Sequence, residues 1–85
     1  MPLNVSVVSA DRALWTGEAT QIIARTTEGE IGILAGHEPI LAVLAEGEVR
    51  VTTTGGETVT ARADDGFLSV QNDTVTIVAG AAELV

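Results

Sequence analysis

One stretch of this 85-residue chain decides its fold: Glu28-Gly29-Glu30-Ile31-Gly32-Ile33-Leu34-Ala35-Gly36-His37-Glu38-Pro39. Glu28-Gly29 is typical of a turn, because glycine adopts a positive φ angle without a steric penalty. Ile31 and Ile33 alternate with Gly32, as they would in a short strand. A glycine inside a strand commonly marks a bulge or the close approach of another backbone. We therefore predict a turn followed by a strand in which Gly32 tolerates no side chain.

The second half of the stretch contains another predicted turn. Gly36-His37-Glu38 interrupts the strand pattern, and Pro39 favours an extended conformation for Glu38. The stretch also holds the only histidine of the chain and one of its two prolines. We expect an exposed, stiff turn–strand–turn that displays two carboxylates and an imidazole.

Length and composition predict a single domain that spans residues 1–85. A chain of this size buries only about 60–65% of its unfolded surface, so its stability is marginal and increases when a partner binds. Hydrophobic residues make up 46% of the chain, which is enough for a core, and there is no cysteine for a disulfide or a thiolate metal site. Residues 1–20 lack the pattern of a signal peptide, and no apolar run approaches the roughly 18–20 residues of a membrane-spanning helix. The expected location is therefore the cytoplasm.

The charge balance restricts the partners. Twelve acidic residues are opposed by four arginines, and the net charge is −8. Such a chain repels phosphate backbones and anionic membrane surfaces, so we expect no nucleic-acid partner and no direct membrane binding. A basic or apolar protein surface is the expected partner.

Short apolar and alternating segments are separated by turn residues along the whole chain. Besides the strand around Ile31 to Ile33, we predict strands over residues 3–7, 13–15, 19–26, 39–45, 47–53, 57–62, 67–70 and 74–79. Thr54-Gly55-Gly56 predicts a tight hairpin, because a Gly-Gly pair suits turns with positive φ. Ser9–Arg12 is expected to be a turn. Residues 80–85 have two interpretations, the start of a helix or simply the end of the fold. This spacing predicts an all-β sandwich or flattened barrel.

The residues offer little for catalysis. One histidine without cysteine cannot form a histidine-rich metal site, and a catalytic histidine needs a second group to orient it. No glycine-rich segment opens a helix with a lysine, as a phosphate-binding loop requires. We expect no catalytic residue, no cofactor and no metal ion, and we assign His37 a role in a turn or interface.

Three other residues have two interpretations each. Trp15 and Phe67 are the only aromatic residues, and we expect both in the core rather than exposed as anchors. Glu30 is either a solvated surface carboxylate or part of a charged contact, since isolated surface charges contribute little.

The whole chain resembles a known family. Glu28–Leu34 and Gly36–Pro39 are similar to the signature of the epsilon subunit of F-type ATP synthases. Residues 7–12, 14–18, 66–70 and 75–79 have the order and spacing of blocks in the sandwich domain of that family.

The resemblance implies a non-catalytic central-stalk subunit. Its fold would be an antiparallel sandwich of about ten short strands that binds the gamma subunit and sits on the c-ring of the rotor, coupling proton translocation to ATP synthesis. It would be peripheral, on the cytoplasmic face of the cell membrane, and associated with the membrane only through the complex. The implied contacts with the c-ring and gamma subunit are Glu28, Gly29, Glu30, Ile31, Gly32, His37 and Glu38, with the carboxylate of Glu30 facing basic groups of the ring.

The chain departs from the family at its end. The family usually adds a C-terminal helical hairpin that regulates hydrolysis and, in some members, binds ATP, whereas this sequence stops at Glu83-Leu84-Val85. We therefore expect neither inhibition of hydrolysis nor nucleotide binding. Two alternatives are a biotinyl- or lipoyl-type carrier, which needs a modifiable lysine that is absent, and a ligand-binding sandwich, which would want more aromatic residues for stacking.

Overall fold

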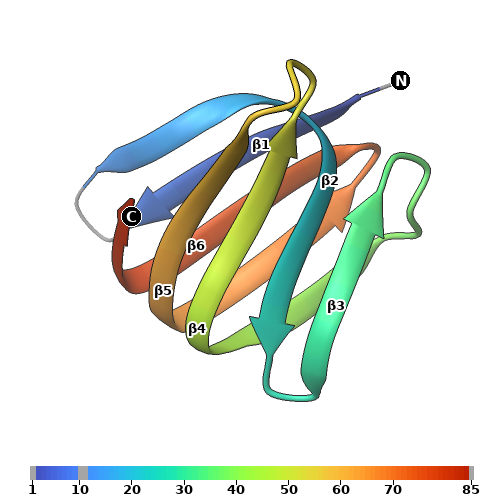
Figure 1. Cartoon of the computed structure of the whole chain (residues 1–85). Coiled ribbons are helices and arrows are strands. Elements are labelled where there is room, and N and C mark those ends of the chain that lie inside the picture. The colour runs from blue at the N-terminus through green and yellow to red at the C-terminus, as the bar shows by residue number, and fades with distance from the viewer. Residues whose placement is uncertain (1, 10–11, 85) are drawn as a thin grey trace.

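The described part of the protein consists of six strands. The computed structural model describes residues 2–9 and 12–84, and these residues form an all-β fold without a helix (Figure 1). The strands are β1 (Leu3–Ser9), β2 (Ala13–Thr26), β3 (Gly29–Leu34), β4 (Ile40–Thr53), β5 (Thr58–Gln71) and β6 (Thr74–Leu84). Residues 10 and 11 of the predicted turn after β1 lie outside the described residues.

The sheet closes on itself. Its order is β1-β6-β5-β4-β2-β3, and an additional pairing between β1 and β2 completes a flattened barrel. All pairings are antiparallel except that of β1 with β6, which is parallel and which the antiparallel prediction missed. Strand β3 pairs only with the second half of β2, so it forms an edge of the sheet.

The described residues form six strands rather than about ten, because three pairs of the predicted short strands are continuous as β2, β4 and β5. Strand β2 pairs with β1 through residues 13–19 and with β3 through residues 21–26, so it passes from one layer to the other. Strands β4, β5 and β6 bend in the same way, and the bends of β4 and β5 lie at the lower edge of Figure 1. The all-β sandwich is confirmed. The expected breaks at residues 46–47 and 63–66 are corners within continuous strands. At the second corner Asp65 has a φ of 60°, and the pairing with β6 continues on both sides of it, at Asp64 and Gly66.

Two local predictions at turns have different outcomes. The hairpin between β4 and β5 is confirmed: the amide of Thr53 donates to the Glu57 carbonyl at 2.7 Å, and Gly56 has a φ of 89°. The chain after Gly80 neither starts a helix nor leaves the fold, since residues 81–84 extend β6 along the first half of β5.

The core lies between the two layers. Alternate residues of each strand point inward, and the largest fully buried side chains are Leu3, Val5, Val7, Ile22, Ile33, Val49, Val51, Leu68, Val70, Val75 and Ile77. Trp15 is half-buried and packs against this core, as expected. Phe67 was predicted wrongly: it is 42% exposed, because Leu68 and Val70 occupy the inward positions of β5 and place Phe67 on the outer face.

The glycine that requires a close backbone approach is Gly66, not Gly32. A Cβ on Gly32 would meet nothing within 4 Å, so the predicted intolerance of Gly32 is wrong: it faces solvent on an edge strand. Gly66 has a φ of 145°, and a Cβ there would overlap the carbonyl oxygen of Val78 and lie 2.7 Å from the Cα of Ala79. The corner of β5 depends on this glycine.

Candidate subunit interface

The turn between β2 and β3 is fixed by a threonine. Thr26 is only 5% exposed, and its hydroxyl donates a hydrogen bond to the carbonyl oxygen of Gly29 at 2.7 Å. The hydroxyl oxygen of Thr26 in turn accepts a hydrogen bond from the amide of Glu28 at 3.2 Å. Thr27 donates its amide to the carbonyl of Val43 at 3.0 Å, which attaches the turn to β4. Gly29 has the predicted positive φ, at 118°. The carboxylate of Glu28 is thus displayed on an ordered turn.

Strand β3 presents its side chains alternately. Glu30 is exposed and lies opposite Arg25 of β2, and Gly32 lies opposite Ile23. Ile31 points inward and packs against the edge of the core. Glu30 and Gly32 therefore belong to the solvent-facing side of the strand, and Ile31 supports it from beneath.

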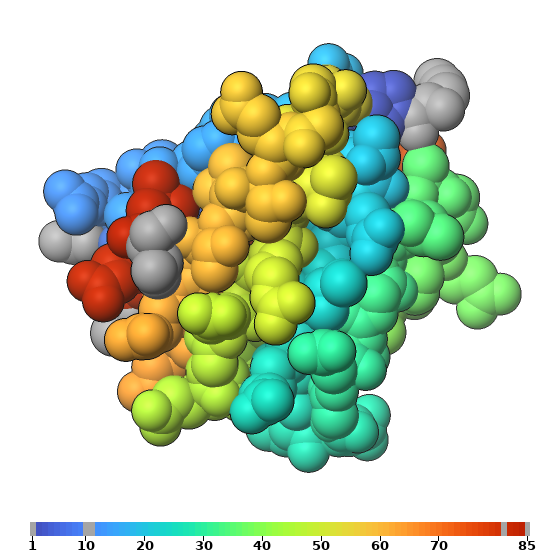
Figure 2. All heavy atoms as spheres, viewed as in Figure 1, coloured from blue at the N-terminus to red at the C-terminus, as the bar shows by residue number. Residues whose placement is uncertain are grey.

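The loop between β3 and β4 carries the other predicted residues. Gly36 has the expected positive φ, 84°, and the amide of His37 donates to the carbonyl of Leu34 at 3.2 Å. His37 is half-buried, and its Nδ1 lies 2.7 Å from the carbonyl oxygen of Glu38. This contact orients the imidazole next to the exposed Glu38. Figure 2 shows that the loop projects from the body of the molecule at the right edge.

The structure does not bring the predicted residues to one place. Glu28 and Gly29 lie at the start of β3, whereas His37 and Glu38 follow its end. A six-residue strand spans roughly 17–20 Å, at about 3.3 Å per residue. The two groups are at opposite ends of the molecule (Figure 1). They can therefore contact two different surfaces.

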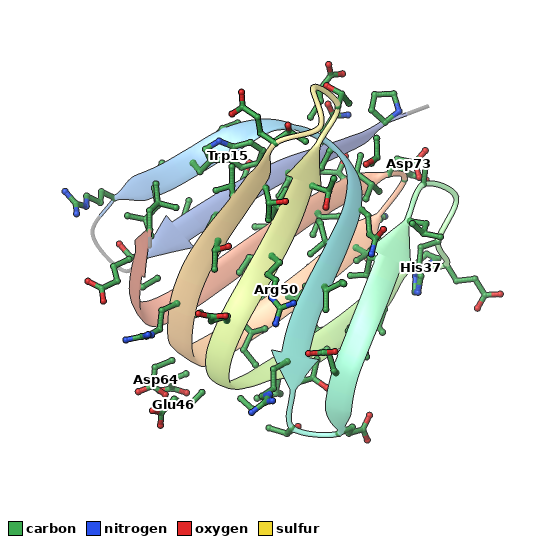
Figure 3. All side chains as sticks on the ribbon, in the orientation of Figure 1. Trp15, His37, Glu46, Arg50, Asp64 and Asp73 are labelled. Carbon is green, nitrogen blue, oxygen red and sulfur yellow. The ribbon has the colours of Figure 1, made fainter. Side chains whose placement is uncertain are left out.

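Further carboxylates gather at the end that holds Glu28. The corners of β4 and β5 are paired there, with Gly47 opposite Ala63, and they carry Glu46, Asp64 and Asp65. Figure 3 shows Glu46 and Asp64 close together at this lower edge. We call this the acidic end, defined by Glu28, Glu30, Glu46, Asp64 and Asp65. The sequence predicts only Glu28 and Glu30 as interface residues, because the segments that hold Glu46, Asp64 and Asp65 have the pattern of separate turns.

An exposed apolar row was missed. It crosses four strands in the layer that lies at the rear in Figure 1. Val43 of β4 lies opposite Phe67 of β5, and Phe67 lies opposite Val78 of β6. Val78 is in turn beside Val8 of β1. Val43 is 56% exposed, and Leu41, two residues before it on the same side of β4, is 73% exposed. We call these residues, Leu41, Val43, Phe67, Val78 and Val8, the apolar row. The parity of β5 could have revealed it, because Phe67 shares its face with Ser69 and not with Leu68.

The opposite outer face is charged. Arg50 of β4 stands on it in Figure 3, and its Nε is 3.9 Å from a carboxylate oxygen of Glu48. Both side chains are about half exposed, so this ion pair contributes little to stability. The contrast between the two faces indicates that the rear face, not the front, is suited to bury against a protein.

A shallow groove joins the apolar row to the acidic end. It has a volume of about 280 Å³ and lies between the β2–β3 turn and the first half of β4, lined by Thr26, Thr27, Glu28, Ile31, Ile40, Leu41, Ala42 and Val43. The groove therefore lies between the two parts of the candidate interface, the charged acidic end and the apolar row.

Neither a metal centre nor a membrane-spanning helix is found in the described part of the chain. Within residues 2–9 and 12–84, no three His, Asp or Glu side chains are grouped so that they could hold a metal ion. The same residues form no helix long and apolar enough to cross a membrane.

Comparison with known families decides the identity of the sandwich. The model of the ATP synthase delta/epsilon chain, beta-sandwich domain, matches residues 2–85. The chain belongs to this family. The resemblance of Glu28–Pro39 and the other blocks to epsilon subunits is thereby confirmed.

Individual relatives agree with the family match. The ATP synthase epsilon chain of Micrococcus luteus is 57% identical over 82 residues, which cover 96% of this chain and 90% of that protein. The epsilon chain of Streptomyces avermitilis is 48% identical, and the match covers 66% of its length. Among solved structures, a chain of the Euglena gracilis mitochondrial ATP synthase, in its OSCP/F1/c-ring assembly, superposes with a TM-score of 0.91 at 30% identity. The match covers 98% of this chain and 53% of that one.

Proposed function

We infer that this chain is a central-stalk subunit of an F-type ATP synthase and links the gamma subunit to the c-ring. Family membership and the similarity to an ATP synthase chain support this function. The structure adds a division of the surface: an acidic end on one side of β3 and an apolar row on the rear layer. A subunit between two partners needs two such surfaces.

The acidic end is the proposed contact with the c-ring. Glu28 and Glu30 extend from the ordered β2–β3 turn, and the corners of β4 and β5 add further carboxylates beside it. Ile31 and the exposed Gly32 support and complete this contact. Opposite charge between the acidic end and basic polar loops of the ring would steer the two together and fix their orientation.

The apolar row and the loop with His37 and Glu38 are the proposed contact with the gamma subunit. The exposed valine, leucine and phenylalanine side chains of this row leave apolar area in water. Removing that area from water against a partner contributes about 25 cal/mol per Å², before the entropic cost of association is subtracted. A chain this small gains stability of its own from such burial. The gamma subunit is thus held mainly by apolar contact, while His37 and Glu38 add polar contacts at the edge.

The proposed role involves no bond chemistry in this chain. The sandwich acts as one domain over residues 1–85, turns with the rotor and transmits torque. It is peripheral, on the cytoplasmic face of the cell membrane, and reaches the membrane through the complex.

The position of the acidic end and the apolar row on separate parts of the barrel carries this proposal. Binding of the chain to purified gamma subunit and to purified c-ring tests it. We expect binding to gamma without the ring, and recovery of the ring when gamma and this chain are both present. Reconstitution of epsilon-depleted enzyme should then restore proton-driven synthesis. Absence of both complexes would contradict the proposed function.

A further inference from the structure

Asp73 occupies the turn between β5 and β6. Gln71 pairs with Thr74, so Asn72 and Asp73 form a two-residue loop, and both have a positive φ, 51° and 59°. Two-residue hairpins of this kind require positive φ at both positions. The carbonyl oxygen of Asp73 accepts a hydrogen bond from the amide of Asn4 at 2.8 Å, which attaches the turn to the start of β1. The backbone of Asp73 is therefore fixed from two sides.

The side chain of Asp73 contacts the loop between β3 and β4. Its Oδ1 accepts a hydrogen bond from the amide of Gly36 at 2.7 Å, across 37 residues of sequence. Figure 3 shows Asp73 and His37 at the same end of the molecule. Gly36 directly precedes His37, so this bond acts on the backbone that carries the imidazole and Glu38.

We propose that Asp73 is a positioning residue, which tethers the loop of residues 35–39 in the conformation that the gamma subunit binds. A loop fixed before binding loses less conformational entropy on association, so its partner binds more tightly. This inference rests on the proposed function of the loop as a contact with gamma. The bond from Gly36 to Asp73 adds to the two contacts within the loop, from His37 to Leu34 and from His37 to Glu38.

Two substitutions separate the side-chain bond from the turn. Asp73→Gly removes the acceptor but leaves an Asn-Gly pair, the sequence that two-residue hairpins favour, so the protein still folds. Asp73→Asn removes the charge but keeps an Oδ1 acceptor, and asparagine also tolerates positive φ. In this 85-residue chain we expect Asp73→Gly to speed exchange of the Gly36 amide by about tenfold and Asp73→Asn to change it by less than about twofold. Binding to purified gamma should weaken by about threefold or more with Asp73→Gly, and remain at the wild-type level with Asp73→Asn.

Three outcomes with the Asp73 variants would overturn the proposal. Unchanged exchange at Gly36 in Asp73→Gly would show that the tether does not order the loop. Faster exchange with unchanged binding to gamma would show that the tether does not position an interface. Faster exchange of the Gly36 amide or weaker binding to gamma in Asp73→Asn would show that the charge of Asp73, not its acceptor oxygen, is responsible.

His37→Ala tests the proposed function separately: it should weaken gamma binding while exchange at Gly36 stays at the wild-type rate. If wild-type chain fails to bind gamma, the proposed function fails and the interface role of Asp73 fails with it.

Discussion

The backbone of Gly66 lies against the carbonyl group of Val78 with no space for a side chain between them. This contact lets β5 and β6 turn the same corner in register, with Gly66 paired to Ala79. Gly66→Ala should lower the free energy of unfolding by about 2–4 kcal/mol, because it adds overlap to an unfavourable φ angle. Denaturant unfolding of the variant and the wild type measures the difference.

Gly32→Val is the matched control for Gly66→Ala. Gly32 lies on an exposed edge strand where a side chain meets nothing within 4 Å, so we expect a change within about 0.5 kcal/mol. A large loss of stability from Gly32→Val, with little loss from Gly66→Ala, would reverse the assignment of the close approach.

Thr26 should contribute to the β2–β3 turn through its hydroxyl. Thr26→Val keeps the shape of the side chain but removes the donor to Gly29 and the acceptor from Glu28. We expect a loss of about 1–2 kcal/mol and faster exchange of the Glu28 amide. Thr26→Ser keeps the hydroxyl and should keep the slow exchange. Equal exchange in the valine variant and the wild type would show that the hydroxyl does not order the turn.

Charge reversal at the acidic end should weaken contact with the c-ring. With gamma present, Glu30→Lys is expected to reduce ring binding by about threefold to tenfold at low salt, and by less at high salt, because ions screen exposed charges. Glu57→Lys makes the same change in the β4–β5 turn, at the opposite end of the barrel, and should leave binding unaffected. If both variants behave alike, net charge and not the acidic end determines binding.

Phe67→Ser should weaken binding to the gamma subunit about tenfold or more, with little dependence on salt, because the lost contact is apolar. Its effect on the stability of the free chain should be below about 1 kcal/mol, since Phe67 is already 42% exposed. Ile23→Ser removes an apolar side chain from the outer side of the opposite layer and serves as the control. Titration of gamma with each variant checks this, and undiminished affinity of Phe67→Ser would exclude the apolar row from the interface.

Much of the fold could be predicted from local patterns. Alternation in Leu3–Val7 and Val49–Thr53 has the period of a strand with one buried face, and Gly29, Gly36 and Gly56 adopt the positive φ angles expected of turns. The family could be identified from Glu28–Pro39, because a match to a family model compares sequences and needs no tertiary contact. These features depend on residues close together in the chain.

The tertiary structure decided what depends on distant segments. The close contact at Gly66 arises from Val78 on the next strand, and Gly32 is open because it lies on the solvent-facing side of β3. Phe67 forms the apolar row with Val43 and Val78 only once β4, β5 and β6 are paired in register.

Local sequence patterns thus specify the strand period, the turns at Gly29, Gly36 and Gly56, the family, and the residues of the stretch from Glu28 to Pro39. The closed barrel alone decides three further features: the separation of that stretch into two ends, the acidic corners, and the hydrogen bond from Gly36 to Asp73. The physical reason is that a local pattern specifies which side of a strand is apolar, whereas pairing between strands far apart in the chain specifies what each side meets.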